Sequence, residues 1–310
     1  MRKSLIALMA VALFAAVPVL AGRLMKNQVS AAATWVVHAD FERFNKSQIG
    51  QLIRADLANR SPGKIVEQLT EVLSMHPLDA VRDITWYGQG IDKWKIVVLC
   101  EGKFDKGKLL ALMEKERGHQ EIKYRDITLH KFDKEPQVNA CFYQDDLIVM
   151  AFTLDASKHA IDVLDGSATN ATKTLLGETT ESMKPAFLQL TVLLPGETAD
   201  ELPKAAIFRQ SRGFHLVVGE TEDKVYADLA LTTKSKDVAR NVSRVLDGLM
   251  AYMALKGEKQ SDSAEIANKV QLSCVQNMVW VRFESDPDST MQFLKEHGPS
   301  LKELWKSQGQ

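Results

Sequence analysis

The sequence predicts an α+β fold made of two similar copies of an antiparallel sheet, with helices packed mainly on one face. Segments in which apolar and polar residues alternate, as in half-buried strands, are interspersed with segments whose apolar residues recur at helical spacing. Short turns join neighbouring strand segments and so favour antiparallel pairing. Several groups of residues also recur at a constant offset of 131 positions, which indicates an internal duplication.

The first copy is expected over residues 34–165. One of its helices carries the apolar residues from Ile65 to Leu73 on a single stripe, so this helix must lie on an apolar surface. Asp105 is a suitable cap for a later helix. The expected elements, in order, are a strand at 34–40, helices near 46–58 and 62–75, strands near 82–88 and 94–101, the helix after Asp105, strands around 124–132 and 139–152, and a helix from about Asp155 to Leu164.

The second copy is expected over residues 185–300, after a linker at 166–184 and before a C-terminal tail at 301–310. From Val225 to Leu231 every second residue is apolar, which predicts a strand with one buried face. A long helix carries an apolar stripe from Val238 to Tyr252. The expected elements are a strand at 186–194, a short helical section around 199–206, strands near 205–210, 213–219 and 224–232, a helix at about 236–256, strands at 268–275 and 278–284, and a helix near 287–297.

The duplication depends on matches that are separated along the chain. Independent origin of similar hairpins is the alternative explanation. Four groups match at the same offset: Gly88 with Gly219, 92–93 with 223–224, 147–152 with 278–283, and Asp155 with Asp286.

Residues 1–21 have the order of a secretory signal peptide. Arg2 and Lys3 precede an apolar stretch that ends at Leu20, and Ala21 is a small residue at a suitable cleavage point. The stretch is shorter than the roughly 20 residues that a spanning helix needs, which favours cleavage over an uncleaved inner-membrane anchor. Residues 22–33 then form a spacer, and its small residues at 30–33 are a second candidate cut site. We therefore expect an exported protein, either periplasmic or secreted.

The charge and hydropathy of the chain exclude some classes of partner. Removal of Arg2 and Lys3 leaves 37 basic against 40 acidic residues, a net charge of −3, so no nucleic-acid partner is expected. No second apolar run approaches membrane-spanning length, so no stable membrane span is expected after signal cleavage.

The chain has three cysteines, an odd number that cannot form a closed disulfide framework. Cys100 and Cys274 fall on the apolar faces of predicted strands, where a free cysteine behaves as a small buried hydrophobe. A bridge between Cys100 and Cys141 is the alternative, since export leads to an oxidising compartment.

His38 and Asp40 are the best candidates for a catalytic or metal site. They lie two residues apart on a predicted strand and therefore on the same face, where a metal ion or a proton relay could use both. No third ligand is indicated by spacing, and an ordinary histidine–carboxylate pair is the simpler interpretation. His130, His159 and His215 each stand alone in the sequence.

The usual enzyme signatures are absent from the sequence, so no cofactor and no metal are expected. Gly88 and Gly90 lack the third glycine and the following helix of a dinucleotide-binding motif, and a hairpin turn explains them better. Carboxylate pairs occur at 145–146 and at Asp286 with Asp288. A turn and a helix cap account for these pairs without a ligand.

Two stretches of the sequence resemble a group of uncharacterised exported bacterial proteins. They are the strand at 33–40 and the segment 101–112, in which Gly102-Lys103-Phe104-Asp105 leads into a helix. The resemblance is strongest over about 33–165. It implies export and an α+β unit, and it brings no activity or functional residue.

These observations favour an exported, non-catalytic binding or structural protein of the cell envelope, whose sheet presents a surface to an unknown protein or polymer. The main alternative is a periplasmic or secreted hydrolase with an unrecognised site built on His38, Asp40 and turn carboxylates. Self-assembly through exposed strand edges is a third possibility.

Overall fold

The computed structural model describes residues 24–59, 64–90, 95–132, 137–174, 176, 184–194, 210–256 and 269–297. The expected signal peptide at 1–21, the helical section near 199–206 and the tail at 301–310 lie outside these residues, as does nearly all of the strand expected at 205–210.

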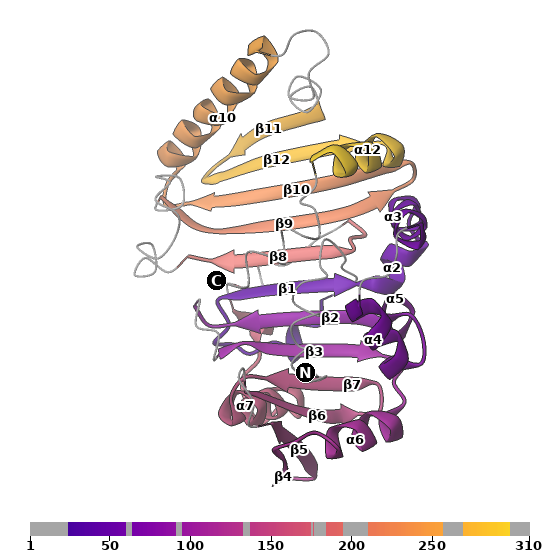
Figure 1. Ribbon diagram of the computed structural model, residues 1–310. Coiled ribbons are helices and arrows are strands. Elements are labelled where there is room, and N and C mark those ends of the chain that lie inside the picture. The colour runs from indigo at the N-terminus through magenta and orange to yellow at the C-terminus, as the bar shows by residue number, and fades with distance from the viewer. Residues whose placement is uncertain are drawn as a thin grey trace.

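Twelve strands form one antiparallel sheet within the described part of the chain (Figure 1). Neighbouring strands follow the order β11-β12-β10-β9-β8-β1-β2-β3-β7-β6-β5-β4. The strand bounds are β1 (Trp35–Asp40), β2 (Val81–Gly88), β3 (Val97–Gly102), β4 (His119–Tyr124), β5 (Ile127–Phe132), β6 (Val138–Gln144), β7 (Leu147–Ala151), β8 (Leu188–Leu193), β9 (Ser211–Thr221), β10 (Lys224–Thr233), β11 (Val270–Val275) and β12 (Met278–Ser285). The α+β class is confirmed, but β1 pairs with β8, so both expected copies contribute to a single sheet.

The helices begin where the sequence supplies capping side chains. Asp40, Ser47, Asp105 and Thr153 each accept a hydrogen bond from a backbone N–H in the first turn of the helix that follows. The helix bounds are α2 (Phe41–Lys46), α3 (Gln48–Ala58), α4 (Lys64–Leu73), α5 (Pro77–Ala80), α6 (Lys106–Glu114), α7 (Leu154–Leu164), α10 (Lys236–Lys256) and α12 (Pro287–His297), with short 3-10 turns η1 (Lys26–Gln28) and η3 (Ala171–Lys173).

The two faces of the sheet carry different cores. The face with Trp86 and Val98, which we call the helical face, packs against residues of α2, α3, α4, α6 and α12. The opposite face, with Tyr87 and Leu99, packs mainly against α7 and the segment from Leu24 to Ala33. The expectation that helices lie mainly on one face is therefore met, with α7 on the other.

Cys100 and Cys141 are both free and buried, so the alternative of a bridge between them is wrong. The physical reason is the alternation of side chains along a strand. Cys100 pairs with Ile148 of β7 and points to the helical face, whereas Cys141 pairs with Val149 and points to the opposite face.

None of the helices among the described residues is long and apolar enough to cross a membrane.

Candidate functional site

The helical face of the second half of the sheet carries a large apolar area. Cross-strand pairing aligns three rows of side chains over β8, β9, β10, β12 and β11. We call these fifteen residues the apolar panel: Leu188, Leu190, Val192, Phe214, Leu216, Val218, Ala227, Leu229, Leu231, Val270, Leu272, Cys274, Val279, Val281 and Phe283.

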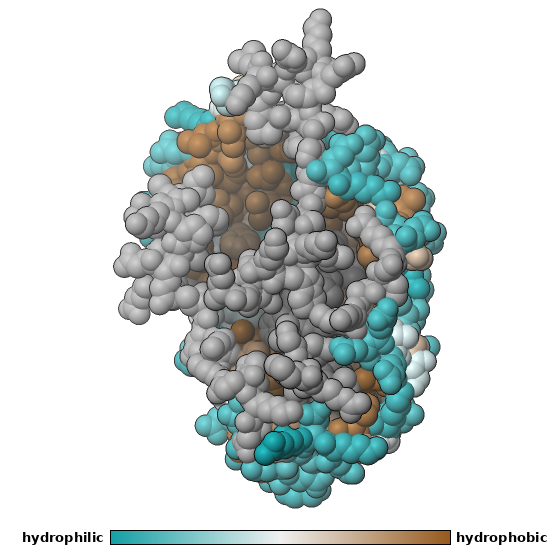
Figure 2. All heavy atoms as spheres, viewed as in Figure 1, coloured by the Kyte–Doolittle hydropathy of each residue, from teal (hydrophilic) through white to brown (hydrophobic). Residues whose placement is uncertain are grey.

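Most of the panel is only partly covered. Leu231 and Val279 are buried, while the other thirteen side chains are half-buried. Figure 2 shows apolar residues gathered in a hollow between α10 and α12, in the upper part of the view. A contiguous apolar surface of this kind is typical of an interaction site.

Two helices border the panel at opposite ends of its strands (Figure 1). Ala239 and Val242 of α10 pack with Leu231 and Val279. The other border is α12, which joins the main core through Met291 and reaches α3 through an ion pair of 3.3 Å between Lys295 Nζ and Asp56 Oδ1. Neither helix covers the middle of the panel.

The apolar stripe of α10 continues past the part that packs on the sheet. Val245, Leu249 and Tyr252 lie at i, i+4 and i+7 and are 60%, 50% and 57% exposed. The sequence predicted one apolar stripe from Val238 to Tyr252, and Val238 and Val242 at its start pack against the sheet. The second half adds exposed apolar surface beside the panel.

The corresponding face of the first half is closed. Ile84, Trp86 and Ile148 are at most 4% exposed and belong to a core cluster that includes residues of α2, α4 and α6. Leu73 of α4 and Leu109 of α6 meet the sheet there. Within the described part of the chain, the two halves therefore present the same kind of sheet face, covered by helices in the first half and only bordered by helices in the second.

His38 and Asp40 both lie on β1, as expected, and each has partners within the protein. The Nδ1 atom of buried His38 shares a hydrogen bond of 2.7 Å with Thr85 Oγ1. Burial lowers the pKa of His38 to about 4, so the imidazole is neutral at pH 7. Asp40 caps α2 by accepting a bond of 2.8 Å from the Arg43 amide. Their catalytic role stays a prediction.

Acidic residues face one another across β1, β2 and β3. Asp40 pairs in register with Asp83, and Asp83 with Glu101. Burial raises the pKa of Asp83 to about 6, and repulsion from Asp40 and Asp146 acts in the same direction. Arg82 opposes this effect, since its guanidinium contacts both Asp83 and Glu101.

The turn carboxylates have structural partners. Asp145 forms an ion pair of 2.8 Å with Lys106. Asp286 caps α12 by accepting a bond of 2.8 Å from the Ser289 amide, and Asp288 lies in the first turn of that helix. Gly90 has a φ of +62° in the turn after β2, which agrees with the turn interpretation.

One group of potential metal ligands was not found from the sequence. His119 and Glu121 of β4 and His130 of β5 each offer one ligand atom, and these atoms lie within 4.8 Å of one another. His130 therefore does not stand alone. The sequence signal for this group is the spacing of His119 and Glu121, two residues apart. This spacing places both side chains on one face only if the segment is known to be a strand.

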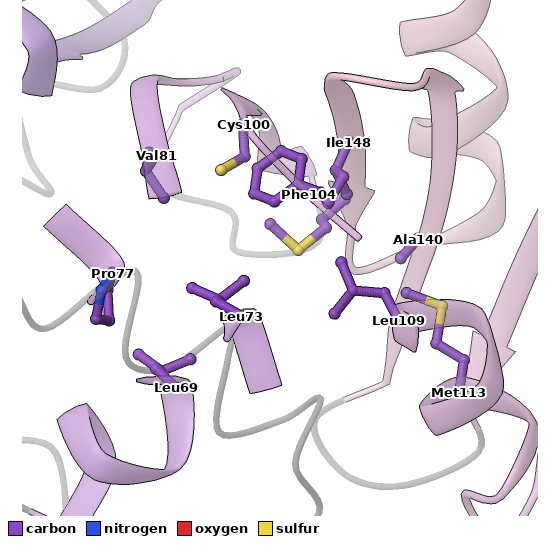
Figure 3. Close-up of a pocket in the computed structure, with 11 residues that line it drawn as sticks. Leu69, Leu73, Pro77, Val81, Cys100, Phe104, Leu109, Met113, Ala140 and Ile148 are labelled. Carbon is purple, nitrogen blue, oxygen red and sulfur yellow. The ribbon is translucent and has the colours of Figure 1, made fainter. Parts of the chain in front are cut away.

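A cavity of roughly 50 Å³ lies under α4 and α6 (Figure 3). Its lining is apolar, with Leu69 and Leu73 on one side and Leu109 and Met113 on the other. Ligand pockets usually span about 300–1,000 Å³ and include a few polar groups. This cavity is therefore a packing defect of the core.

No family model and no curated protein matches the chain. Crystal form III of TP0453 is similar at 10% identity with a TM-score of 0.50, over 87% of this chain and 97% of that chain. Crystal form IV of TP0453 is similar at 9% identity with a TM-score of 0.50, over 87% and 95%. At such identity the likeness concerns the fold alone.

Proposed function

We propose that this chain is a non-catalytic, exported binding protein of the cell envelope, and that its apolar panel holds an amphipathic helix of a partner protein. One observation carries the proposal: thirteen of the fifteen apolar side chains of the panel are only half-buried. Burying such a surface stabilises a complex by roughly 25 cal/mol per Å² of apolar area, before the cost of association.

The choice of a helix as the occupant follows from the first half of the sheet. There, α4 and α6 cover the equivalent face. Strands lie about 4.8 Å apart, so five strands span roughly 20 Å, enough for a helix of about 10–12 Å diameter beside α10 or α12. The panel has no polar side chain to orient a small ligand, which argues against a small-molecule site.

The proposed duplication is supported by the order of strands. Outward from the β1–β8 junction, one side runs β1, β2, β3, β7, β6 and the other runs β8, β9, β10, β12, β11. In both series the last two strands along the chain are reversed in space, with β7 inside β6 and β12 inside β11, while β4 and β5 are additional strands outside β6 in the first half. A duplicated unit would give this repeated strand order. We take the unit to be related to the exported proteins that residues 33–165 resemble.

The contacts of His38 and Asp40 support a non-catalytic role. A buried, neutral imidazole bonded to Thr85 and a carboxylate that caps α2 both serve the fold. A hydrolytic activity of the purified protein that is lost in both His38→Gln and Asp40→Asn, with folding intact, would favour the hydrolase instead.

Export is supported by the basic, apolar and small-residue order of residues 1–21. N-terminal sequencing of the protein recovered from the envelope should give Gly22 as the first residue. An intact Met1 would favour the inner-membrane anchor.

Site-specific photocrosslinking in the producing cell tests the panel. A benzophenone amino acid replaces Leu229, at the centre of the panel, or Gln271, which is exposed on the opposite face of β11. We expect the Leu229 position to crosslink to another protein through a segment with apolar residues at helical spacing, and the Gln271 position not to do so. Crosslinks to lipid, to another segment of this chain, or equally from both positions would overturn the proposal.

A further inference from the structure

The hairpin at one edge of the sheet brings two histidines and a glutamate together. β4 and β5 are joined by a two-residue turn, and Glu121 pairs in register with His130. His119 lies two residues before Glu121 on the same strand, so all three side chains point to the same face. This edge is at the other end of the sheet from β11 and the apolar panel.

The three side chains are close enough to share one ion. His119 Nε2 lies 3.0 Å from His130 Nδ1, and His130 Nδ1 lies 3.9 Å from Glu121 Oε1. In a tetrahedral site with bonds of about 2.0–2.1 Å, two ligand atoms are roughly 3.3 Å apart. These two separations bracket that value, and all three ligand atoms lie within 4.8 Å of one another, so shifts of up to roughly an ångström would bring them to tetrahedral spacing.

The imidazole rings must also turn slightly. The rings of His119 and His130 are nearly parallel, at 14°, and their nitrogens face each other in a hydrogen bond. To bind one ion, the lone pairs of His119 Nε2 and His130 Nδ1 must both point to the ion, at a position beside the line that joins the two nitrogens. His119 is half-buried and Glu121 is exposed, so both have room to rotate around the fixed, buried His130.

Neighbouring groups hold the site and favour a cation. The ring of Phe132, which is buried, stacks on His119 with a centroid distance of 5.4 Å. Glu114, at the end of α6, acts electrostatically on His130 in the same sense as Glu121. The site thus combines a packed imidazole, a second imidazole and two nearby carboxylates.

We propose that His119, Glu121 and His130 form a binding site for a divalent first-row transition metal ion. Imidazole and carboxylate ligands suit Zn²⁺ and related ions, and two histidines with one carboxylate form a recurrent three-ligand set. Three protein ligands leave one tetrahedral position for water or for a further ligand. The ion would also tie the edge strand β4 to β5.

Zn²⁺ affinity tests the site directly. The purified, untagged protein carries Cys274→Ser, because Cys274 is half-buried and its thiol is a competing ligand. Competition with a chromophoric chelator should give one ion per chain. Glu121→Gln and His119→Gln should each weaken binding at least about tenfold, since loss of an outer-shell partner alone costs about 10–100-fold.

The control is His76→Gln, at an exposed histidine that caps α5 away from the hairpin. It should leave the Zn²⁺ affinity unchanged. Saturating Zn²⁺ should also raise the Tm of the parent protein and of His76→Gln, and should raise that of Glu121→Gln by less. No bound ion in the parent protein, or an affinity that Glu121→Gln and His119→Gln leave unaltered, would overturn the proposal.

Discussion

His38 Nδ1 lies 2.7 Å from Thr85 Oγ1 across the β1–β2 pairing, with both side chains buried in the sheet. A similar bond of 2.8 Å joins His215 of β9 to Thr191 of β8. His38 thus lies on β1, at the β1–β8 junction, and His215 lies on β9, next to β8; in each histidine the Nδ1 atom shares a hydrogen bond with a threonine hydroxyl. Both are neutral when the protein is folded, which makes stability depend on pH.

Acid should destabilise the fold through His38. Burial lowers its pKa from 6.5 to about 4. Because the unfolded chain takes up the proton first, the stability is full above pH 6.5 and is lost as the pH falls from 6.5 towards 4, by about 2 kcal/mol at pH 5. His215, whose pKa burial also lowers to about 4, should add a similar loss.

Denaturant unfolding of wild type and His38→Gln at pH 7 and pH 5 measures this effect. The variant should be less stable than the wild type at pH 7, because a buried site is disturbed. It should then lose about 2 kcal/mol less on going to pH 5. Equal losses in the two proteins would contradict the burial of a neutral His38.

Asp83 should act with the opposite sign. Burial raises its pKa from 3.8 to about 6, so its contribution to stability is present at low pH and is lost as the pH rises from 3.8 through 6. Asp83→Asn removes the charge. The difference in unfolding free energy between variant and wild type should therefore shift in favour of the variant by about 2 kcal/mol between pH 4.5 and pH 7. A difference that is the same at both pH values would show that Asp83 ionises normally.

The strands and helices with strong local signals could be predicted from the sequence. The helix expected at 236–256 has those bounds, and the helix expected near 287–297 begins at Pro287 after its Asp286 cap. In each case a helical stripe or a capping carboxylate lies within the element itself, so tertiary context was not needed.

β4 was missed because its signal is weak. Its sequence, His-Gln-Glu-Ile-Lys-Tyr, is mostly polar, as suits an edge strand with one partner. Without β4, His119 and Glu121 could not be placed opposite His130. The candidate metal site therefore depended on an element that alternation does not reveal.

The open panel could not be predicted either, for a different reason. The alternation from Val225 to Leu231 predicts an apolar face, but it says nothing about what covers that face. The apolar stripe from Val238 to Tyr252 likewise predicts that one face of the helix packs against an apolar surface, but it does not indicate which surface. Whether apolar surface meets another element of the same chain is decided by topology.

Substitution of Gly219 by alanine should destabilise the protein, whereas the same substitution at Gly248 should not. An added Cβ would lie 2.4 Å from the carbonyl oxygen of Pro185 and 2.6 Å from Tyr226 Oη. Because the backbone cannot withdraw easily, Gly219→Ala should lower the unfolding free energy by about 1–3 kcal/mol. Gly248, in α10, has no atom within 4 Å of such a Cβ, and Gly248→Ala should raise stability by about 0.5–1 kcal/mol. Thermal unfolding of both variants measures these changes in stability. A destabilised Gly248→Ala would mean that α10 is strained at that position.

Filling the cavity under α4 and α6 should stabilise the protein. Ala140 lines that cavity from β6, and valine adds two methyl groups at a strand position that favours β-branched residues (Figure 3). Ala140→Val should therefore raise the unfolding free energy by about 0.5–2 kcal/mol. The matched control is Ala160→Val, at a fully buried alanine of α7 on the opposite face, where added volume meets packed neighbours and should cost about 1–3 kcal/mol. Chemical denaturation of both variants measures the two effects. If Ala140→Val destabilised the protein as much as Ala160→Val, the cavity between Leu73 and Leu109 would be absent in solution.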